Sequence, residues 1–259
     1  MNLETFFEKF DLFAAAPNAV AKMRELVRQL AVQGRLVEQD QDEPVGDLLA
    51  RIENAKERLI KRREIKRVSV EPNPTGGDDY GPLPSGWLWT RLGIAFDVRD
   101  GTHDTPKYTN EGFPLITSKN IYTGSLSFEG ANLISEEDHR QIGERSRVDR
   151  GDILFATIGS IGNPVIVDTD REFSIKNVAL FKYYAANEPE RRFLLQYLKL
   201  ASEKMRAKAA GGVQSFVSLS FLRNYPFPLP PLAEQKRIVA KMDELMALCD
   251  WLEAQQKER

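Results

Sequence analysis

The stretch "YPFPLPPLAEQKRIVAKMDELMALCDWLEA", residues 225–254, decides how this chain is organised. Its first part holds four prolines, at positions 226, 228, 230 and 231. Because proline lacks a backbone donor and restricts the residue before it, these prolines predict an extended segment without regular structure. An apolar-striped helix begins directly afterwards, so the prolines set this helix apart from the residues that precede it.

The apolar residues of this helix repeat every three or four positions, which is the spacing of a seam between paired helices. The seam consists of Ile238, Met242, Leu245, Cys249 and Leu252. A helix set apart with such a seam needs a partner helix, and a homodimer through this helix would supply one. Packing of the seam against the helix's own domain is an alternative that the spacing leaves open.

Two further amphipathic helices are predicted within residues 1–70, a helical N-terminal region. Their apolar stripes are Val20, Met23, Val27 and Leu30 in the first and Val45, Leu48, Ile52, Ala55 and Leu59 in the second. Gly34 is expected to interrupt the first helix. Residues 71–86 are predicted to form a linker, because four prolines and four glycines fall between positions 70 and 86.

Residues 87–230 have a different sequence pattern, with short β-rich runs separated by glycine turns up to about residue 184. A short helix capped by Ser135 and a longer helix over residues 190–210 are predicted among or after these strands. The fold class is therefore α+β. We expect the helical N-terminal region, one mixed α/β domain with a β-rich core, and a long C-terminal helix over residues 231–259 that is able to form a coiled coil.

The composition of the 259 residues narrows the class of protein. The single cysteine excludes an internal disulfide and fits a reducing compartment. No apolar run approaches the ~20 residues that a membrane helix needs, so a cytoplasmic protein without membrane contact is expected. Although the net charge is only -2, residues 191–208 hold six Lys/Arg and one acid, and residues 51–67 hold eight against three. Such stretches are either a footprint for phosphate or solvated helix faces.

The sequence offers no recognisable catalytic set. His103 and His139 lie in different contexts, and with one cysteine they cannot complete a zinc site, so no metal is expected. No G-x-S-x-G nucleophile turn is present, and "IGSIGN" at residues 158–163 lacks the lysine of a phosphate-binding loop. The chain is therefore predicted to be non-catalytic.

Polar loops between the strands suggest recognition of DNA instead, because their side chains can donate to phosphate oxygens and reach base edges. The candidate residues are Arg99, Thr102, His103, Thr105, Lys107, Tyr108, Lys119, Asn120, Ser160, Lys176, Asn177, Gln214 and Ser215. Asn120 and Gln214 are candidates for pairing with adenine, as amide side chains do. For each position the alternative is a turn residue that satisfies local backbone groups.

Five stretches of the chain resemble the specificity subunits of type I restriction-modification systems. They are "LAVQGRLVEQDQDEPVGDLL" (30–49), "GPLPSGWLWTRLG" (81–93), "DGTHDTPKYTNEGFPLITSKNI" (100–121), "RGDILFATIGSIG" (150–162) and "GGVQSFVSLSFLRNYPFPLPPLAEQKRIVAKMDEL" (211–245). Together they span nearly the whole chain, and the junction with "PLAEQKRIV" is the most specific of them.

The resemblance implies a target-recognition domain over residues 87–230 that reads one half of a split site in double-stranded DNA. Residues 231–259 would be a conserved spacer helix that pairs antiparallel with another. Adenine methyltransferase subunits would dock on residues 1–70 and on the spacer. Since the family has two of each part, this chain is either a half-subunit that homodimerises or the N-terminal half of a longer subunit; its end inside the charged "EAQQKER" favours the latter.

The resemblance also implies how the chemistry is divided. Partner subunits would methylate adenine N6 or restrict the DNA, and they would bind S-adenosylmethionine, ATP and Mg²⁺, with no cofactor in this chain. The restriction subunit would be the translocase. The alternative function is a protein-interaction scaffold that regulates such a complex without binding DNA.

Overall fold

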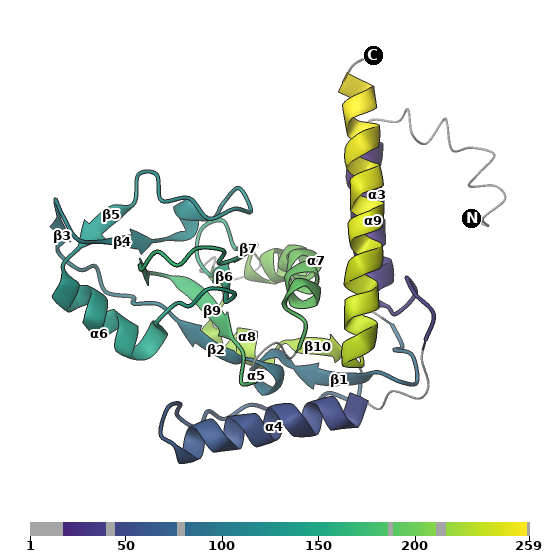
Figure 1. Ribbon diagram of the computed structural model, residues 1–259, viewed down its shortest axis with the longest axis horizontal. Helices are drawn as coiled ribbons and strands as arrows, with labels where there is room; N and C mark the ends of the chain where they lie inside the picture. The colour runs from purple at the N-terminus through teal and green to yellow at the C-terminus, as the bar shows by residue number, and fades with distance from the viewer. Residues whose placement is uncertain (1–17, 40–44, 77–80, 186–188, 211–215, 258–259) are drawn as a thin grey trace.

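The computed structural model describes residues 18–39, 45–76, 81–185, 189–210 and 216–257 (Figure 1). Its helices are α3 (Ala19–Val32), α4 (Val45–Lys61), α5 (Leu92–Ala95), the 3-10 helix η1 (Ser118–Asn120), α6 (Glu136–Ser146), α7 (Arg191–Ala210), α8 (Leu219–Asn224) and α9 (Leu232–Lys257). Its strands are β1 (Leu88–Arg91), β2 (Asp97–Asp100), β3 (Tyr108–Thr109), β4 (Phe113–Ile116), β5 (Asn132–Ile134), β6 (Ile153–Ala156), β7 (Gly162–Ile166), β8 (Ser174–Ile175), β9 (Val178–Lys182) and β10 (Pro226–Leu229). Helical ends flank a β-rich centre, as predicted.

Two four-stranded sheets form that centre, with strand orders β2-β9-β6-β7 and β3-β5-β4-β8. The central strands β6 and β9 are buried on both faces. Phe155 and Phe181 belong to the larger hydrophobic core, whereas Leu154 and Leu180 belong to a smaller one. Strands covered on both faces have near-continuous apolar runs, which explains "ILFA" and "VALFK".

The larger core extends from the sheet to helices at both ends of the chain. It contains Leu48 and Ile52 from α4, Phe193 from α7 and Ile238 from α9. The helices predicted from apolar stripes are therefore present, and part of each stripe packs in or against this core. Within the part of the chain that the structure describes, no helix is long and apolar enough to cross a membrane.

The proline-rich segment is a strand, so the prediction that it lacks regular structure was wrong. β10 pairs antiparallel with β1, with Trp89 opposite Pro228 and Arg91 opposite Pro226. Backbone N–H groups point alternately to the two sides of a strand. Two prolines spaced by two residues leave the donors of Phe227 and Leu229 for β1, and no other strand among the described residues pairs with β10.

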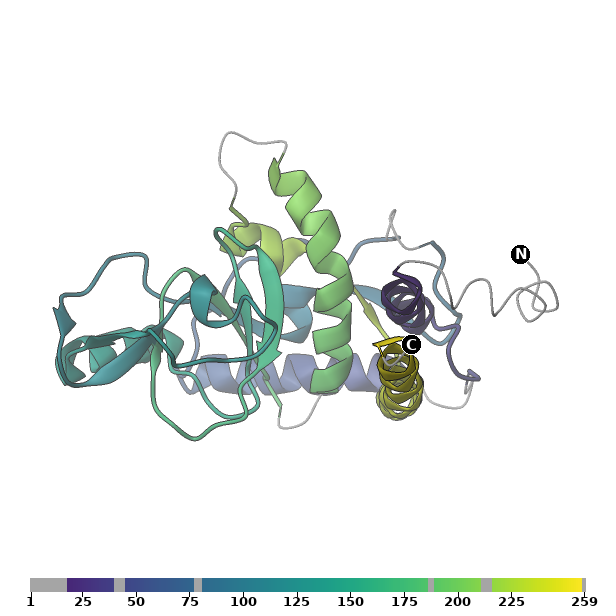
Figure 2. The ribbon, with the colours of Figure 1, turned by 90° about the horizontal axis from the view of Figure 1, so that it is seen from above.

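The seam of α9 packs within its own chain. α3 lies alongside α9 in both views (Figures 1 and 2). The two helices are antiparallel, because Arg24 near the start of α3 pairs with Asp250 and Glu253 near the end of α9, at 2.6 and 2.7 Å. Of the seam residues, Ile238, Met242 and Cys249 are buried, and Leu245 and Leu252 are half-buried. The stripe thus finds an intramolecular partner, which was the alternative to a homodimer.

Glu234 and Gln235, in the "PLAEQKRIV" junction, form hydrogen bonds to residues of several other segments. Gln235, fully buried, donates from Nε2 to the Pro230 carbonyl at 2.8 Å and accepts the Glu190 N–H at 2.7 Å. Glu234, 1% exposed, accepts from Trp87 Nε1 at 2.9 Å and from Gln39 Nε2 at 2.7 Å. These two side chains join the start of α9 to the start of α7, to β1 and to the segment after α3.

Candidate nucleic-acid interface

Four polar loops meet at one edge of the β-rich centre because of how the strands run. β2 and β6 are both antiparallel to β9, so both end where β9 begins. β4 and β8 pair in parallel and end together, and the Lys176 N–H donates to the Ile116 carbonyl at 2.9 Å. We call residues 101–106, 117–124, 157–161 and 176–177 at this position the loop edge.

Two polar side chains hold His103 at the loop edge. Its Nε2 lies 2.8 Å from Asp100 Oδ2 and its Nδ1 lies 3.0 Å from Asn177 Oδ1. These two acceptors favour the imidazolium, whose two N–H groups can donate to both. The Asn177 oxygen first, and the Asp100 carboxylate second, raise the pKa of His103 above its ordinary value of 6.5. Arg145 from α6 forms an ion pair with Asp100 from the other side.

Backbone and side-chain bonds hold the neighbouring loops to one another. The Thr102 N–H donates to the Ile175 carbonyl at 3.0 Å, and the Lys176 ammonium contacts the Thr105 hydroxyl. Thr157 Oγ1 donates to the Asn177 carbonyl at 2.8 Å. Asn177 adopts φ +54°, a left-handed conformation that asparagine tolerates better than most residues. Thr102, His103, Thr105, Lys176 and Asn177 are therefore brought together, as their shared chemistry suggested.

The exposed residues Lys119 and Ser160 extend this surface. A Cβ built on Gly159 would lie 3.7 Å from Ser118 Oγ, so the turn after β6 runs beside the 3-10 helix that carries Lys119. Ile158 and Phe216, joined by a β-bridge, remain 42% and 45% exposed. Cations, hydroxyls and apolar side chains therefore stand next to one another at the loop edge.

Asn120 has a different role from the predicted reading of bases. Its side chain is buried, and its Oδ1 accepts from the Thr117 N–H at 3.0 Å and from Thr117 Oγ1 at 3.1 Å. Its Nδ2 donates to the Glu129 carbonyl at 3.4 Å. The Asn120 amide thus satisfies groups of its own turn and the Glu129 carbonyl, which was the alternative given for each candidate position.

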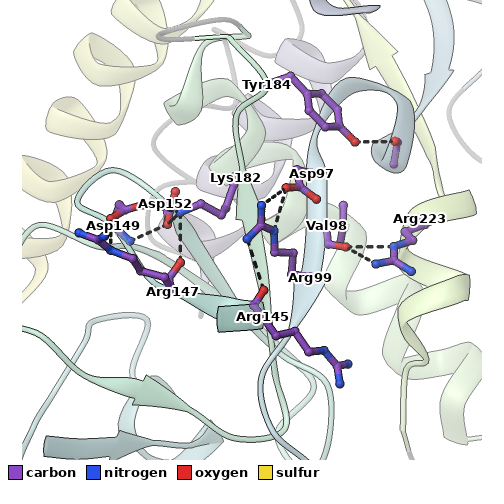
Figure 3. A network of polar contacts seen from close by, with 11 residues as sticks. Asp97, Val98, Arg99, Arg145, Arg147, Asp149, Asp152, Lys182, Tyr184 and Arg223 are labelled. Atoms are coloured by element: carbon purple, nitrogen blue, oxygen red, sulfur yellow. Dashed lines mark hydrogen bonds and ion pairs between the residues drawn. The ribbon is translucent and has the colours of Figure 1, made fainter. Parts of the chain in front are cut away.

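Arg99 is also engaged within the protein. Figure 3 shows its guanidinium against Asp97, with contacts of 2.6 and 2.8 Å, and directed at the Arg145 carbonyl, 3.3 Å away. In the same network the Arg223 guanidinium donates twice to the Val98 carbonyl, at 2.8 and 3.0 Å. These arginines brace β2 against α6 and α8, and so support the loop that follows β2.

The remaining predicted residues lie apart or outside the described chain. Tyr108, 47% exposed, lies on β3 at the far end of the smaller sheet, with the exposed Lys107 before it (Figure 1). Gln214 and Ser215 lie outside the described residues. Among those described, no group of three or more His, Cys, Asp or Glu side chains is placed to hold a metal ion. The predicted cap by Ser135 is confirmed, since its Oγ accepts the Asp138 N–H at 3.1 Å.

Sequence reasoning missed Asp100 and Arg145, which orient His103. Asp100 lies three residues before His103 in "DGTHDTPKY", so its closeness in sequence could have indicated the pair. Arg145 comes from the end of α6, and nothing in the sequence pairs it with Asp100.

Comparisons with known proteins agree on one family. Residues 84–259 match the family model described as the type I restriction modification DNA specificity domain. The specificity subunits of the type I restriction enzymes EcoAI and EcoEI of Escherichia coli are 32% and 31% identical to the chain. Each alignment covers 95% of this chain and 42% of the relative. The chain thus spans less than half the length of these relatives.

Solved structures share the fold. The crystal structure of the HsdS subunit from Thermoanaerobacter tengcongensis aligns with a TM-score of 0.53 and 21% identity, over 92% of this chain and 50% of that one. A chain from a structural study of complex assembly and conformational transition of the type I R-M system aligns with a TM-score of 0.55 and 22% identity, over 92% and 52%.

Proposed function

The chain belongs to the family of type I restriction-modification specificity proteins, and we propose that its loop edge reads one half of a bipartite site in double-stranded DNA. The observation that carries this proposal is the convergence of four polar loops at one edge of the sheets. DNA recognition needs side chains that position the backbone next to side chains that contact base edges. The loop edge offers both kinds at fixed positions.

Different residues of the loop edge suit different contacts. Lys119 and Lys176 carry charge without a carboxylate partner among the described residues, which suits phosphate oxygens. The Asn177 side chain, held through its Oδ1 by His103, keeps its amide nitrogen for a base edge. The exposed apolar atoms of Ile158 and Phe216 suit the methyl group of thymine.

The chemistry on DNA belongs to partner subunits in this proposal, and the chain itself is non-catalytic. An adenine methyltransferase subunit, docked on residues 1–70 and α9, takes the adenine out of the duplex and methylates N6. Extrusion of a base costs a few kcal/mol, which contacts from both subunits offset. S-adenosylmethionine stays with the methyltransferase, and ATP and Mg²⁺ stay with the restriction subunit. A second recognition domain reads the other half of the site, supplied by another copy or by further polypeptide.

Selection from a pool of random duplexes tests this proposal. The full chain is mixed with the methyltransferase subunit encoded beside it, and the bound duplexes are sequenced. Enrichment of one short motif is expected, and a double variant, His103→Ala with Asn177→Ala, should lose that motif while it retains salt-sensitive binding. A pool that stays random with the wild-type chain would favour the scaffold function instead.

A further inference from the structure

A pocket of about 300 Å³ lies between α7, α3, the start of β7 and the loop at residues 122–124. Three cationic side chains from two helices line it: Arg28 from α3 and Lys199 and Arg206 from α7. Thr123, Asn163 and Ser202 add polar groups, and no carboxylate is among the lining residues. None of the residues predicted to bind DNA lines the pocket, although residues 122–124 of its wall also belong to the loop edge.

Among the described residues no ion pair neutralises the cations that line this pocket, although the carboxylates of Glu203 and Glu25 act on Arg28 from outside the lining. Arg28 Nε donates to the neutral amide of Gln196 at 3.3 Å, and Arg206 Nη1 donates to the Ile161 carbonyl at 3.1 Å. Within the described ranges Lys199 makes no ion pair. Burial, and then the charge of Arg28, lower the pKa of Lys199. Like charges that converge without a direct ion pair cost free energy, which an anion in the pocket would recover.

Backbone packing gives this pocket a fixed shape. Gly162 adopts φ +102°, and a Cβ built on it would lie 2.7 Å from Ser202 of α7. Only glycine permits this close approach, which presses the start of β7 against α7. Asn163 and Pro164 are thereby held at the wall of the pocket, opposite Arg28. The basic run noted at residues 191–208 is thus not simply a solvated face, because two of its cations point into one built pocket with a third from α3.

We propose that this pocket binds a phosphate group. The guanidinium groups of Arg28 and Arg206 would donate to its oxygens in pairs, and the Lys199 ammonium would act as a point charge. The phosphate belongs either to the DNA backbone or to a free compound such as inorganic phosphate or a nucleotide. The site does not depend on the loop edge reading DNA, so it can hold even where the proposed function fails.

Chemical labelling of amines tests the site in the full chain. Acylation of Lys199 is followed by mass spectrometry in inorganic phosphate and in chloride at equal ionic strength. The control is Lys236, an exposed lysine on α9 outside the pocket. We expect phosphate to slow the labelling of Lys199 several-fold and to leave Lys236 unchanged, and Arg206→Gln to remove this protection. Equal labelling of Lys199 in both salts would overturn the proposal.

Duplex DNA then identifies the source of the phosphate. If the DNA backbone fills the pocket, the duplex also protects Lys199, and Lys199→Gln lowers the slope of log affinity against log salt by about 0.9 for every sequence. Protection by inorganic phosphate but not by bound duplex retains the site and assigns it to a free phosphate compound. If no duplex binds while phosphate still protects, the proposed function fails and the pocket remains.

Discussion

His103 joins two loops of the loop edge through a charge that depends on pH. Its ring bridges Asp100, at the end of β2, and Asn177, directly before β9. Since both partners are acceptors, the bridge is complete only when the ring is protonated. The protonation state of this histidine therefore changes the local positive charge and one of several contacts between two loops that we assign to DNA.

We predict that DNA affinity falls as the pH rises through the pKa of His103. This pKa is raised above 6.5, so the imidazolium and its contribution to folding are present at lower pH and are lost above the raised value. Fluorescence anisotropy at constant ionic strength measures the effect. In His103→Gln this pH dependence should be absent, and an unchanged dependence in that variant would show that another group is responsible.

Lys107 is predicted to contact the DNA backbone rather than a base. It is exposed on the loop that leads into β3. Lys107→Ala should weaken binding to all sequences alike and reduce the salt slope by about 0.9, the value expected for one lost phosphate contact. Lys236→Ala, which removes the same charge from α9, is the control. Equal salt slopes in wild type and Lys107→Ala would remove this loop from the interface.

At single positions the sequence predicted which loops are polar, but it did not predict what each polar side chain contacts. The polar loops were predicted, and the structure gathers His103, Lys176 and Asn177 at one edge. Asn120, in contrast, is consumed by a local cap, and Arg99 by Asp97. The sequence alone does not distinguish a loop asparagine or arginine that faces solvent from one that bonds to a near neighbour, as Asn120 does to Thr117 and Arg99 does to Asp97.

At the start of α9, the hydrogen bonds of Gln235 are expected to stabilise the fold. Gln235→Ala would leave the Glu190 N–H and the Pro230 carbonyl buried without their partner. Each unsatisfied buried group costs about 1–3 kcal/mol, so we expect the free energy of unfolding to fall by at least that amount. Urea denaturation measures it. Lys236→Ala, one residue further and exposed, should change stability by less than about 0.5 kcal/mol.

The helix α9 allows a test of the predicted homodimer. Ile238 is fully buried in the larger core, whereas Leu248 and Trp251 are 52% and 60% exposed. In a monomer, Ile238→Ala should cost about 2–5 kcal/mol, and Leu248→Ala should have little effect at any protein concentration. A melting temperature that depends on concentration, and loses that dependence in Leu248→Ala, would show that copies pair through this face of α9.

Helices were predictable from the sequence because their signals are local. The apolar stripes placed α3, α4 and α9, and Ser135 placed the start of α6. Strand pairing is not local: β10 joins β1, which begins at Leu88, well over a hundred residues earlier in the chain. The prolines that argued against a strand are compatible with this one because β10 pairs only with β1 within the part of the chain that the structure describes.

Across the whole molecule, the loop edge and the cationic pocket share one connection. The turn from Thr157 to Asn163 begins at the loop edge, beside Asn177, and ends at the wall of the pocket, beside Ser202. One turn thus joins the cations of the loop edge to the cations that line the pocket. The net charge of -2 conceals this distribution, which only the folded chain reveals.

A map of N6-methyladenine in the genome that carries this gene tests the central claim most directly. The map is compared between cells with the gene intact, with the gene deleted, and with the deletion complemented by the wild-type gene. If the chain reads half of a bipartite site, methylation at one split motif disappears on deletion and returns on complementation. Complementation with the His103→Ala, Asn177→Ala double variant should fail to restore that motif. A split motif that stays methylated after deletion would contradict the account.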